Sequence, residues 1–211
     1  MFDKKFKFHF SIFLIWLFSI SGIFGILSEE HSQWFLSMTP LNLLLTFIIL
    51  LINIDPVKPK IIIALSIPFF LGFITEALGV NYGLIFGSYA YGENLGYKIF
   101  GVPIMICVNW ALLTAATADI AIFFTKNRII SAFIGGALMT ILDLLLEVSA
   151  PRFDFWEFEG GVVPLQNYIG WLVTAFIAHL GYQYFDIKTN KTISWHILIS
   201  IALFFAVFLF F

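Results

Sequence analysis

Residues 129–149 read IISAFIGGALMTILDLLLEVS, an apolar segment that carries two acids, Asp143 and Glu147. A helix that spans the hydrocarbon core of a bilayer needs about 20 residues, so this segment predicts a membrane helix. The two acids are four residues apart, which places them on one face of that helix. A charged side chain near the bilayer centre costs at least about 2.5 kcal/mol on insertion scales. Such acids therefore face a bundle interior, pair with another group or carry out chemistry.

The composition of the whole chain also indicates a membrane protein. It has 211 residues, of which 61% are hydrophobic and 11% are charged, whereas about 25% are charged in a soluble domain. The net charge of -2 argues against a nucleic-acid partner. The single cysteine, Cys107, excludes an internal disulfide and a cysteine-rich metal site.

Seven segments have the length of a membrane span, which predicts an all-α, polytopic membrane helix bundle formed by residues 1–211 as a single transmembrane domain. We expect the spans at residues 8–28, 35–54, 61–79, 102–124, 129–149, 164–185 and 193–211. In the second span, Pro40 suits the first turn of a helix. No A-x-A cleavage site follows the first span, so we expect a retained helix and not a signal peptide.

The basic residues fall mostly on one side of the membrane that these spans would define. Nine of the 11 belong to the N-terminal side: Lys4, Lys5, Lys7, Lys58, Lys60, Lys126, Arg128, Lys188 and Lys191. The opposite side has only Lys98 and Arg152. The positive-inside rule then predicts a cytoplasmic N-terminus and an external C-terminus. We expect a multi-pass protein of a bacterial inner membrane. Six or eight spans would break this alternation.

Two loops on the predicted external side have unusual compositions. Residues 80–101 are rich in glycine and tyrosine, and residues 150–164, APRFDFWEFEGGVVP, alternate aromatic and acidic side chains. Both are expected to fold back over the outer end of the bundle. The alternative is an interfacial aromatic belt, because tyrosine and tryptophan collect at membrane surfaces.

Acids and amides from four predicted helices fall in one layer near the external end. They are Glu76, Asn109, Asp143, Glu147 and Asn167, and the two loops add Tyr82, Tyr89, Tyr91, Asp154, Trp156 and Glu157. A polar network that only holds the helices together is one interpretation. Asp143 and Glu147 favour another, because like charges on adjacent turns repel and burial disfavours ionisation. At least one of them is expected to be protonated, and a neutral acid beside an ionised one forms an acid–base pair.

Asp119 lies outside this layer, about 25 Å along its helix from the external end. Its neighbours are small residues, as at close helix contacts, so we expect a structural role. His179, at a similar depth, is its expected partner. The histidines are scattered, and there is no D-D-x-x-D-like run, P-loop, G-x-G-x-x-G or G-x-S-x-G motif. We therefore expect neither a metal nor another cofactor.

Three stretches resemble the CruF-type family of integral-membrane carotenoid hydratases, a carotenoid biosynthesis protein family. The first is EALGVNYGLIFGSYAYGENLG at 76–96, followed by G-V-P at 101–103 and Asn109-Trp110. The second is DLLLE at 143–147 with Trp156, and the third is VPLQNYIGW at 163–171. They cover about half of the chain. Val148 replaces an expected proline and Phe158 an expected tryptophan, and neither change removes an ionisable group.

The resemblance implies that water adds to the ψ-end double bond of an acyclic or monocyclic carotenoid of the lycopene or γ-carotene type. Membrane lipid would deliver the polyene, and the interface would deliver the water. The product is a tertiary 1-hydroxy carotenoid, and the reaction needs no cofactor. The alkene must be protonated by a neutral acid, aromatic faces must stabilise the cation, and a base must activate water.

Each residue of the layer has an expected role under this interpretation. Asp143 is expected to donate the proton and Glu76 to orient water as the base, although the two could be exchanged. Glu147 would keep the donor protonated or relay protons. Pocket walls are expected from Tyr82, Tyr89, Tyr91, Trp110, Trp156 and Trp171, and positioning of water or carboxylates from Asn109 and Asn167.

Three other functions compete with hydration. A membrane lycopene cyclase protonates the same end group but lets an internal alkene capture the cation, so its product keeps the mass of the substrate. A transporter or ion pathway also uses intramembrane acids, but here they cluster on one side and no internal repeat is visible. A retinal-binding protein needs a lysine in the last span, which has none.

Overall fold

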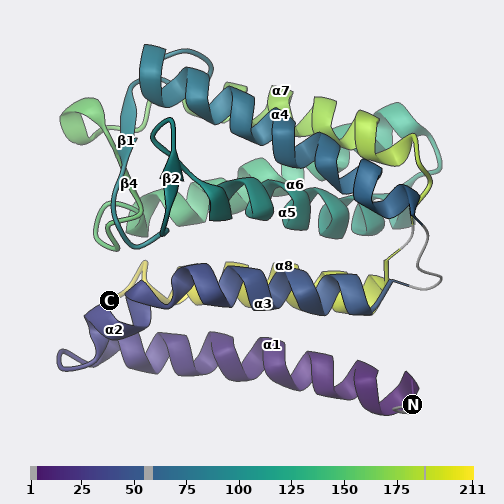
Figure 1. The fold of residues 1–211 in the computed structure, drawn as a ribbon, viewed down its shortest axis with the longest axis horizontal. Helices are drawn as coiled ribbons and strands as arrows, with labels where there is room; N and C mark the ends of the chain where they lie inside the picture. Colours follow the sequence, from purple (N-terminus) through teal and green to yellow (C-terminus); the bar gives the residue numbers. More distant parts are fainter. Residues whose placement is uncertain (1–3, 55–58, 188) are drawn as a thin grey trace.

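Eight α-helices make up most of the chain in the computed structural model, which describes residues 4–54, 59–187 and 189–211 (Figure 1). They are α1 (Lys4–Leu27), α2 (Ser32–Ser37), α3 (Thr39–Ile52), α4 (Lys60–Tyr82), α5 (Ile104–Phe124), α6 (Arg128–Ser149), α7 (Leu165–Gln183) and α8 (Lys191–Val207). The predicted all-α architecture is confirmed. Two basic residues used to predict the orientation, Lys58 and Lys188, lie outside the described residues.

The helices occupy the seven segments expected from the sequence, with differences in their bounds: α1 already begins at Lys4 and α8 ends at Val207. The second segment is broken at Met38 into α2 and α3, and Pro40 lies in the first turn of α3 as predicted. The third expected segment forms α4, which continues to Tyr82 and ends where Gly83 adopts a left-handed backbone with φ 65°. Among the described residues, α1, α4, α5 and α6 are long and apolar enough to cross a membrane. Seven crossings remain a prediction.

In the view of Figure 1 the helices fall into an upper and a lower group, which pack against each other through α5. One contains α4, α5, α6 and α7, and the other contains α1, α3 and α8, with α5 touching α3 and α8. Close approach of α6 and α7 depends on Gly136, where a Cβ would lie 3.2 Å from the backbone nitrogen of Phe176. Small residues allow such contacts between membrane helices. The central helix α5 is buried along most of its length.

The two ends of the bundle differ in what they contain. The N-terminus and the ends of α3, α5 and α7 lie at one end, while the C-terminus and the strands lie at the other (Figure 1). Within the described residues, this antiparallel arrangement brings the helix starts that carry Lys4, Lys60, Arg128 and Lys191 to one end. Which end faces the cytoplasm stays a prediction.

The two loops at the strand end pair with each other. Strand β1 (Tyr89–Tyr91) lies antiparallel to β4 (Trp156–Phe158), with Tyr91 opposite Trp156. A second ladder joins β2 (Lys98–Ile99) to β3 (Val102–Pro103), and a short 3-10 turn, η1 (Glu159–Gly161), follows β4. The sequence predicted that the loops fold back but not that they form strands. This pairing brings the tyrosines of one loop and the tryptophan of the other to the same end of the bundle.

Candidate active site

Glu76, on α4, accepts hydrogen bonds from three side chains of the described chain. Its Oε2 accepts from the hydroxyl of Tyr89 and, at 2.8 Å, from the hydroxyl of Tyr91. Its Oε1 accepts from Nε1 of Trp110 at 2.9 Å. The tyrosines are alternate residues of β1, so both project from the same side of the strand. Three donors suit the ionised form of a carboxylate, which only accepts.

Tyr89 and Tyr91 remain donors because of where they are buried. Burial, and then the charge of Glu76, raise the pKa of both phenols well above the usual value. Tyr89 fits closely over α4, since a Cβ at Gly79 would lie 2.8 Å from its ring. The glycine therefore leaves the space in which this tyrosine reaches Glu76.

Asp143 and Glu147, on α6, share one amide from α7. Nδ2 of Asn167 donates to Oδ2 of Asp143 and to Oε1 of Glu147, both at 2.9 Å. The second oxygen of Glu147 accepts from Nε1 of Trp156 at 2.9 Å. Oδ1 of Asp143 is buried and has no hydrogen-bond partner in the described structure. An ionised carboxylate with an unpartnered buried oxygen is costly, so this arrangement favours a proton on the Asp143–Glu147 pair.

Stacked aromatic rings lie beside Glu76, because Trp110, which donates to this acid, also packs on Trp171. Trp110 and Trp171 stack with their ring centroids 4.5 Å apart and an interplanar angle of 17°. Gly72 makes room for this stack, because a Cβ there would lie 2.4 Å from Trp110. Phe86 adds a third ring, 6.3 Å from Trp171. Aromatic faces carry partial negative charge and stabilise cations.

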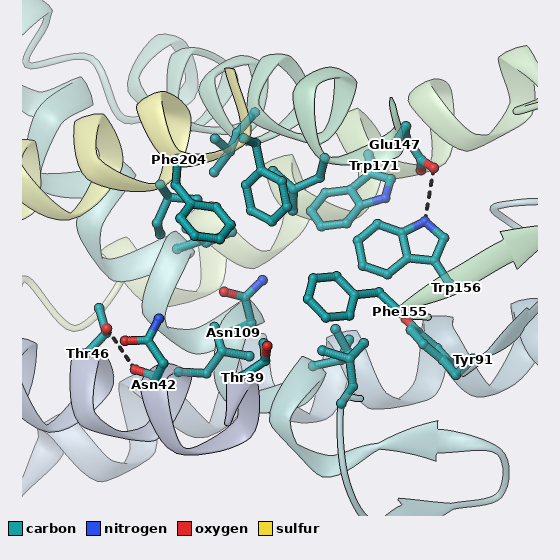
Figure 2. A pocket seen from close by; sticks show the side chains of 18 of the residues that line it. Thr39, Asn42, Thr46, Tyr91, Asn109, Glu147, Phe155, Trp156, Trp171 and Phe204 are labelled. Carbon is teal, nitrogen blue, oxygen red and sulfur yellow. Dashed lines mark hydrogen bonds between the residues drawn. The ribbon is translucent and has the colours of Figure 1, made fainter. Parts of the chain in front are cut away.

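A cavity connects the acids, the aromatic rings and the second helix group (Figure 2). It comprises about 1160 Å³ of space free of protein atoms, part of it continuous with the outside. The expected site residues on its wall are Glu76, Tyr89, Tyr91, Asn109, Glu147, Trp156, Asn167 and Trp171. None of the described residues that line it is Lys, Arg or His. The cavity is therefore acidic at one end and otherwise apolar or neutral.

Three expected residues lie elsewhere. Asp143 is only 1% exposed and lies behind Asn167, and Trp110 lies behind Trp171, so neither lines the cavity. Of the two acids on α6, Glu147 is the one that lines the cavity, and the assignment of Asp143 as the proton donor stays a prediction. Tyr82 is 73% exposed and is not part of the cavity, because it ends α4 before the chain turns at Gly83.

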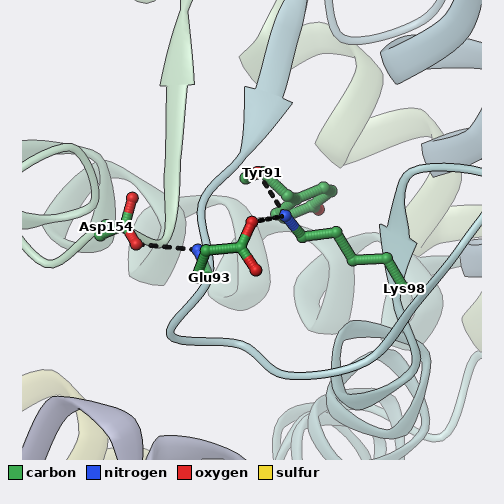
Figure 3. Close-up of polar contacts among 4 residues, drawn as sticks. All are labelled: Tyr91, Glu93, Lys98 and Asp154. Atoms are coloured by element: carbon green, nitrogen blue, oxygen red, sulfur yellow. Dashed lines mark hydrogen bonds and ion pairs between the residues drawn. The ribbon is translucent and has the colours of Figure 1, made fainter.

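A polar clamp fixes the two loops above the acids (Figure 3). Oδ2 of Asp154 accepts from the backbone nitrogen of Glu93 at 2.8 Å. Nζ of Lys98 donates to the backbone oxygen of Tyr91 at 2.9 Å and pairs with Oε1 of Glu93 at 2.8 Å. Asp154 thus helps to hold the chain that follows β1 in place, whereas Glu157 is exposed on β4.

The expected pairing of the deep residues Asp119 and His179 is not formed, because each has other hydrogen-bond partners. Oδ2 of Asp119 accepts from Thr189 at 2.6 Å, in the connection between α7 and α8. The ring of His179 contacts Thr117 at 2.8 Å and the backbone oxygen of Ala175 at 2.7 Å. Depth alone could not separate Asp119 from Thr117, which lie about half a turn apart on α5.

Several cavity residues were missed from the sequence. Phe86, Phe155 and Phe158 come from the two loops, and their positions depend on strand pairing. Asn42 and Thr46, on α3, could have been predicted from the sequence, because they are polar residues one turn apart in an otherwise apolar segment. Among the described residues, no group of three or more His, Cys, Asp or Glu side chains is placed to hold a metal ion.

Comparison with known proteins adds independent information. A family model described as "Carotenoid biosynthesis protein" matches residues 37–211. A bisanhydrobacterioruberin hydratase from Haloarcula japonica is 30% identical over 120 residues, which is 52% of this chain. The alignment spans 40% of the length of that relative. No solved structure matches the chain significantly.

Proposed function

Because the chain belongs to the carotenoid biosynthesis protein family, we propose that it is a carotenoid hydratase of the membrane. The substrate is the ψ-end group of an acyclic or monocyclic carotenoid, of the lycopene or γ-carotene type. One observation carries the proposal: a carboxylate with three hydrogen-bond donors, Glu76, lines the same aromatic cavity as Glu147, an acid that shares the amide of Asn167 with Asp143. The similarity to a carotenoid hydratase supports the same class of reaction.

The proton comes from the acid pair. Glu147 lines the cavity, so it transfers the proton to the alkene carbon that bears one hydrogen. The double bond supplies the electron pair for the new C–H bond, and its other carbon becomes a tertiary cation. Asp143 shares the hydrogen bonds of Asn167 with Glu147 and re-protonates it afterwards. Proton transfer by a positioned acid contributes about 10² to 10⁴ in rate.

Water completes the reaction at the tertiary cation. The oxygen of water forms the new C–O bond, and the proton that it loses goes to Glu76, which also lines the cavity. Oε1 of Glu76 accepts one hydrogen bond, from Trp110, and retains a lone pair for this water. The ring of Trp171 faces the cavity and stabilises the cation in the meantime. The proton taken up by Glu76 then returns to the Asp143–Glu147 pair through water, so the net change is addition of one water, with no change in oxidation state of any protein group.

The surroundings of the site suit a lipid-dissolved substrate and a supply of water. The cavity is lined mainly by apolar and aromatic side chains, and the acids lie at the strand end of the bundle, the end predicted to be external. We place the protein in the inner membrane of a bacterium, with this end outward.

The experiment is expression in a host that accumulates lycopene or γ-carotene, followed by mass analysis of the pigments. We expect pigments that have gained one water. Glu147→Gln and Glu76→Gln should each lower the yield strongly, whereas Glu157→Gln, an exposed acid on β4, is the matched control and should not. Absence of a hydrated pigment despite verified membrane expression would contradict the proposal. A new pigment with unchanged mass would instead identify a cyclase.

A further inference from the structure

A second polar region lies in the same cavity, away from the acids. Figure 2 shows Thr39, Asn42 and Thr46 of α3, with Asn109 of α5, at the end of the cavity opposite Glu147. The three α3 residues are spaced i, i+3 and i+7, so they share one helix face. The opposite face of α3 presents Leu41, Leu44 and Ile48 to the outside. The sequence of α3 thus directs its polar face into the cavity.

The hydroxyls and the amides of this region differ in how they are satisfied. Thr46 donates to the backbone oxygen of Asn42 at 2.8 Å, one turn earlier in its own helix. The side-chain amides of Asn42 and Asn109 have no hydrogen-bond partner among the described residues. Both side chains line the cavity, Asn42 is exposed and Asn109 is half-buried, so both amides are available to a ligand that enters the cavity.

The chemistry of the wall limits what this ligand can be. An asparagine side chain offers two donors and one acceptor oxygen, so it complements a group that both donates and accepts. No described residue that lines the cavity is Lys, Arg or His, which disfavours a phosphate or a carboxylate. An uncharged O–H group meets both conditions.

We propose that Asn42 and Asn109 form a binding site for an uncharged hydroxyl group, either a water molecule or a hydroxyl of the bound polyene. This site rests on the proposed hydratase function only in one respect, which is that the bound polyene is a carotenoid. Under the proposed reaction both kinds of hydroxyl pass through this cavity, because water must enter it to reach Glu76 and the hydroxylated product must leave it. Asn42 is exposed while it lines the cavity, so the site lies beside an opening.

Binding and turnover distinguish the two sources. Purified protein in lipid nanodiscs, carrying Glu147→Gln to prevent turnover, is titrated with an acyclic hydrocarbon carotenoid and with its 1-hydroxy derivative, and the visible absorption shift is measured. If the site holds a hydroxyl of the polyene, the 1-hydroxy derivative binds about three- to tenfold more tightly, the value of one neutral hydrogen bond. Asn42→Leu and Asn109→Leu then each reduce this preference.

If the site holds water, the two carotenoids bind equally well, and the same variants lower the rate of hydration with Glu147 intact. Gln166→Leu is the matched control, because Gln166 is an exposed amide outside the cavity. The proposal is overturned if Asn42→Leu and Asn109→Leu change neither the binding preference nor the rate beyond this control. A binding effect without any hydration by the wild type would instead refute the hydratase function and leave this site standing.

Discussion

Replacement of Asn167 by leucine tests the link between the two acids of α6. The side chains are similar in size, so Asn167→Leu removes the amide without leaving a large cavity. Both hydrogen bonds from Nδ2 are lost, and they join α7 to α6 at 2.9 Å each. Asp143 then keeps no side-chain donor among the described residues.

The expected loss of unfolding free energy in Asn167→Leu follows from the number and kind of hydrogen bonds that this change removes. Interhelical hydrogen bonds in a membrane protein contribute about 0.6 kcal/mol on average and at most about 1.7 kcal/mol. Two of them give a loss of about 1 to 3 kcal/mol in the free energy of unfolding. Since only one involves Asp143, a double-mutant cycle of Asn167→Leu with Asp143→Leu should show coupling of about 0.5 to 1.5 kcal/mol.

The assay is equilibrium unfolding of the purified variants in mixed micelles, followed by tryptophan fluorescence. Gln166→Leu is the control, because it makes the same chemical change at the preceding, exposed position of α7. The reasoning is refuted if Asn167→Leu is no more destabilising than Gln166→Leu. Coupling indistinguishable from zero would separately refute the hydrogen bond between Asn167 and Asp143.

Three further changes test other parts of the site. Gly79→Ala should displace Tyr89, because the new Cβ would lie 2.8 Å from its ring, and hydration should fall at least about tenfold on pigment analysis. Lys98→Met should lower hydration more than Glu93→Gln, since Lys98 also holds the backbone of β1 while the exposed ion pair contributes at most about 1 kcal/mol. Asp119→Asn should leave hydration within about twofold of the wild type and lower the unfolding temperature, because this acid anchors the connection after α7.

Each of these has a clear contrary result. Full activity of Gly79→Ala would show that Tyr89 is not needed at Glu76. Equal effects of Lys98→Met and Glu93→Gln would assign the function of the clamp to the ion pair alone. A large loss of hydration in Asp119→Asn, with normal membrane insertion, would place that acid in the reaction.

The sequence could predict those features that depend on local periodicity. Apolar runs near 20 residues located the helices, because every backbone group in a bilayer must be hydrogen-bonded within its own segment. The i, i+4 spacing put Asp143 and Glu147 on one helix face, and the structure has both buried there on one amide. The acid layer at one end of the bundle followed from depth along each helix.

Orientation and pairing between distant segments were decided only by the tertiary structure. Tyr89 and Tyr91 face Glu76 because β1 pairs with β4, which lies 65 to 69 residues further along the chain. Tyr82, in the same loop sequence, faces outward because α4 extends to it. Likewise Glu147, and not Asp143, reaches the cavity, although both lie on the same side of α6.

The physical reason is the range of the forces concerned. Helix geometry fixes which residues share a face within a few turns, so 129–149 by itself determined that two acids would be buried together. Which of them meets a ligand depends on where α7, the two loops and α3 pack against that face. Those contacts are made between residues far apart in sequence, through side-chain shape and close packing, and no local pattern encodes them.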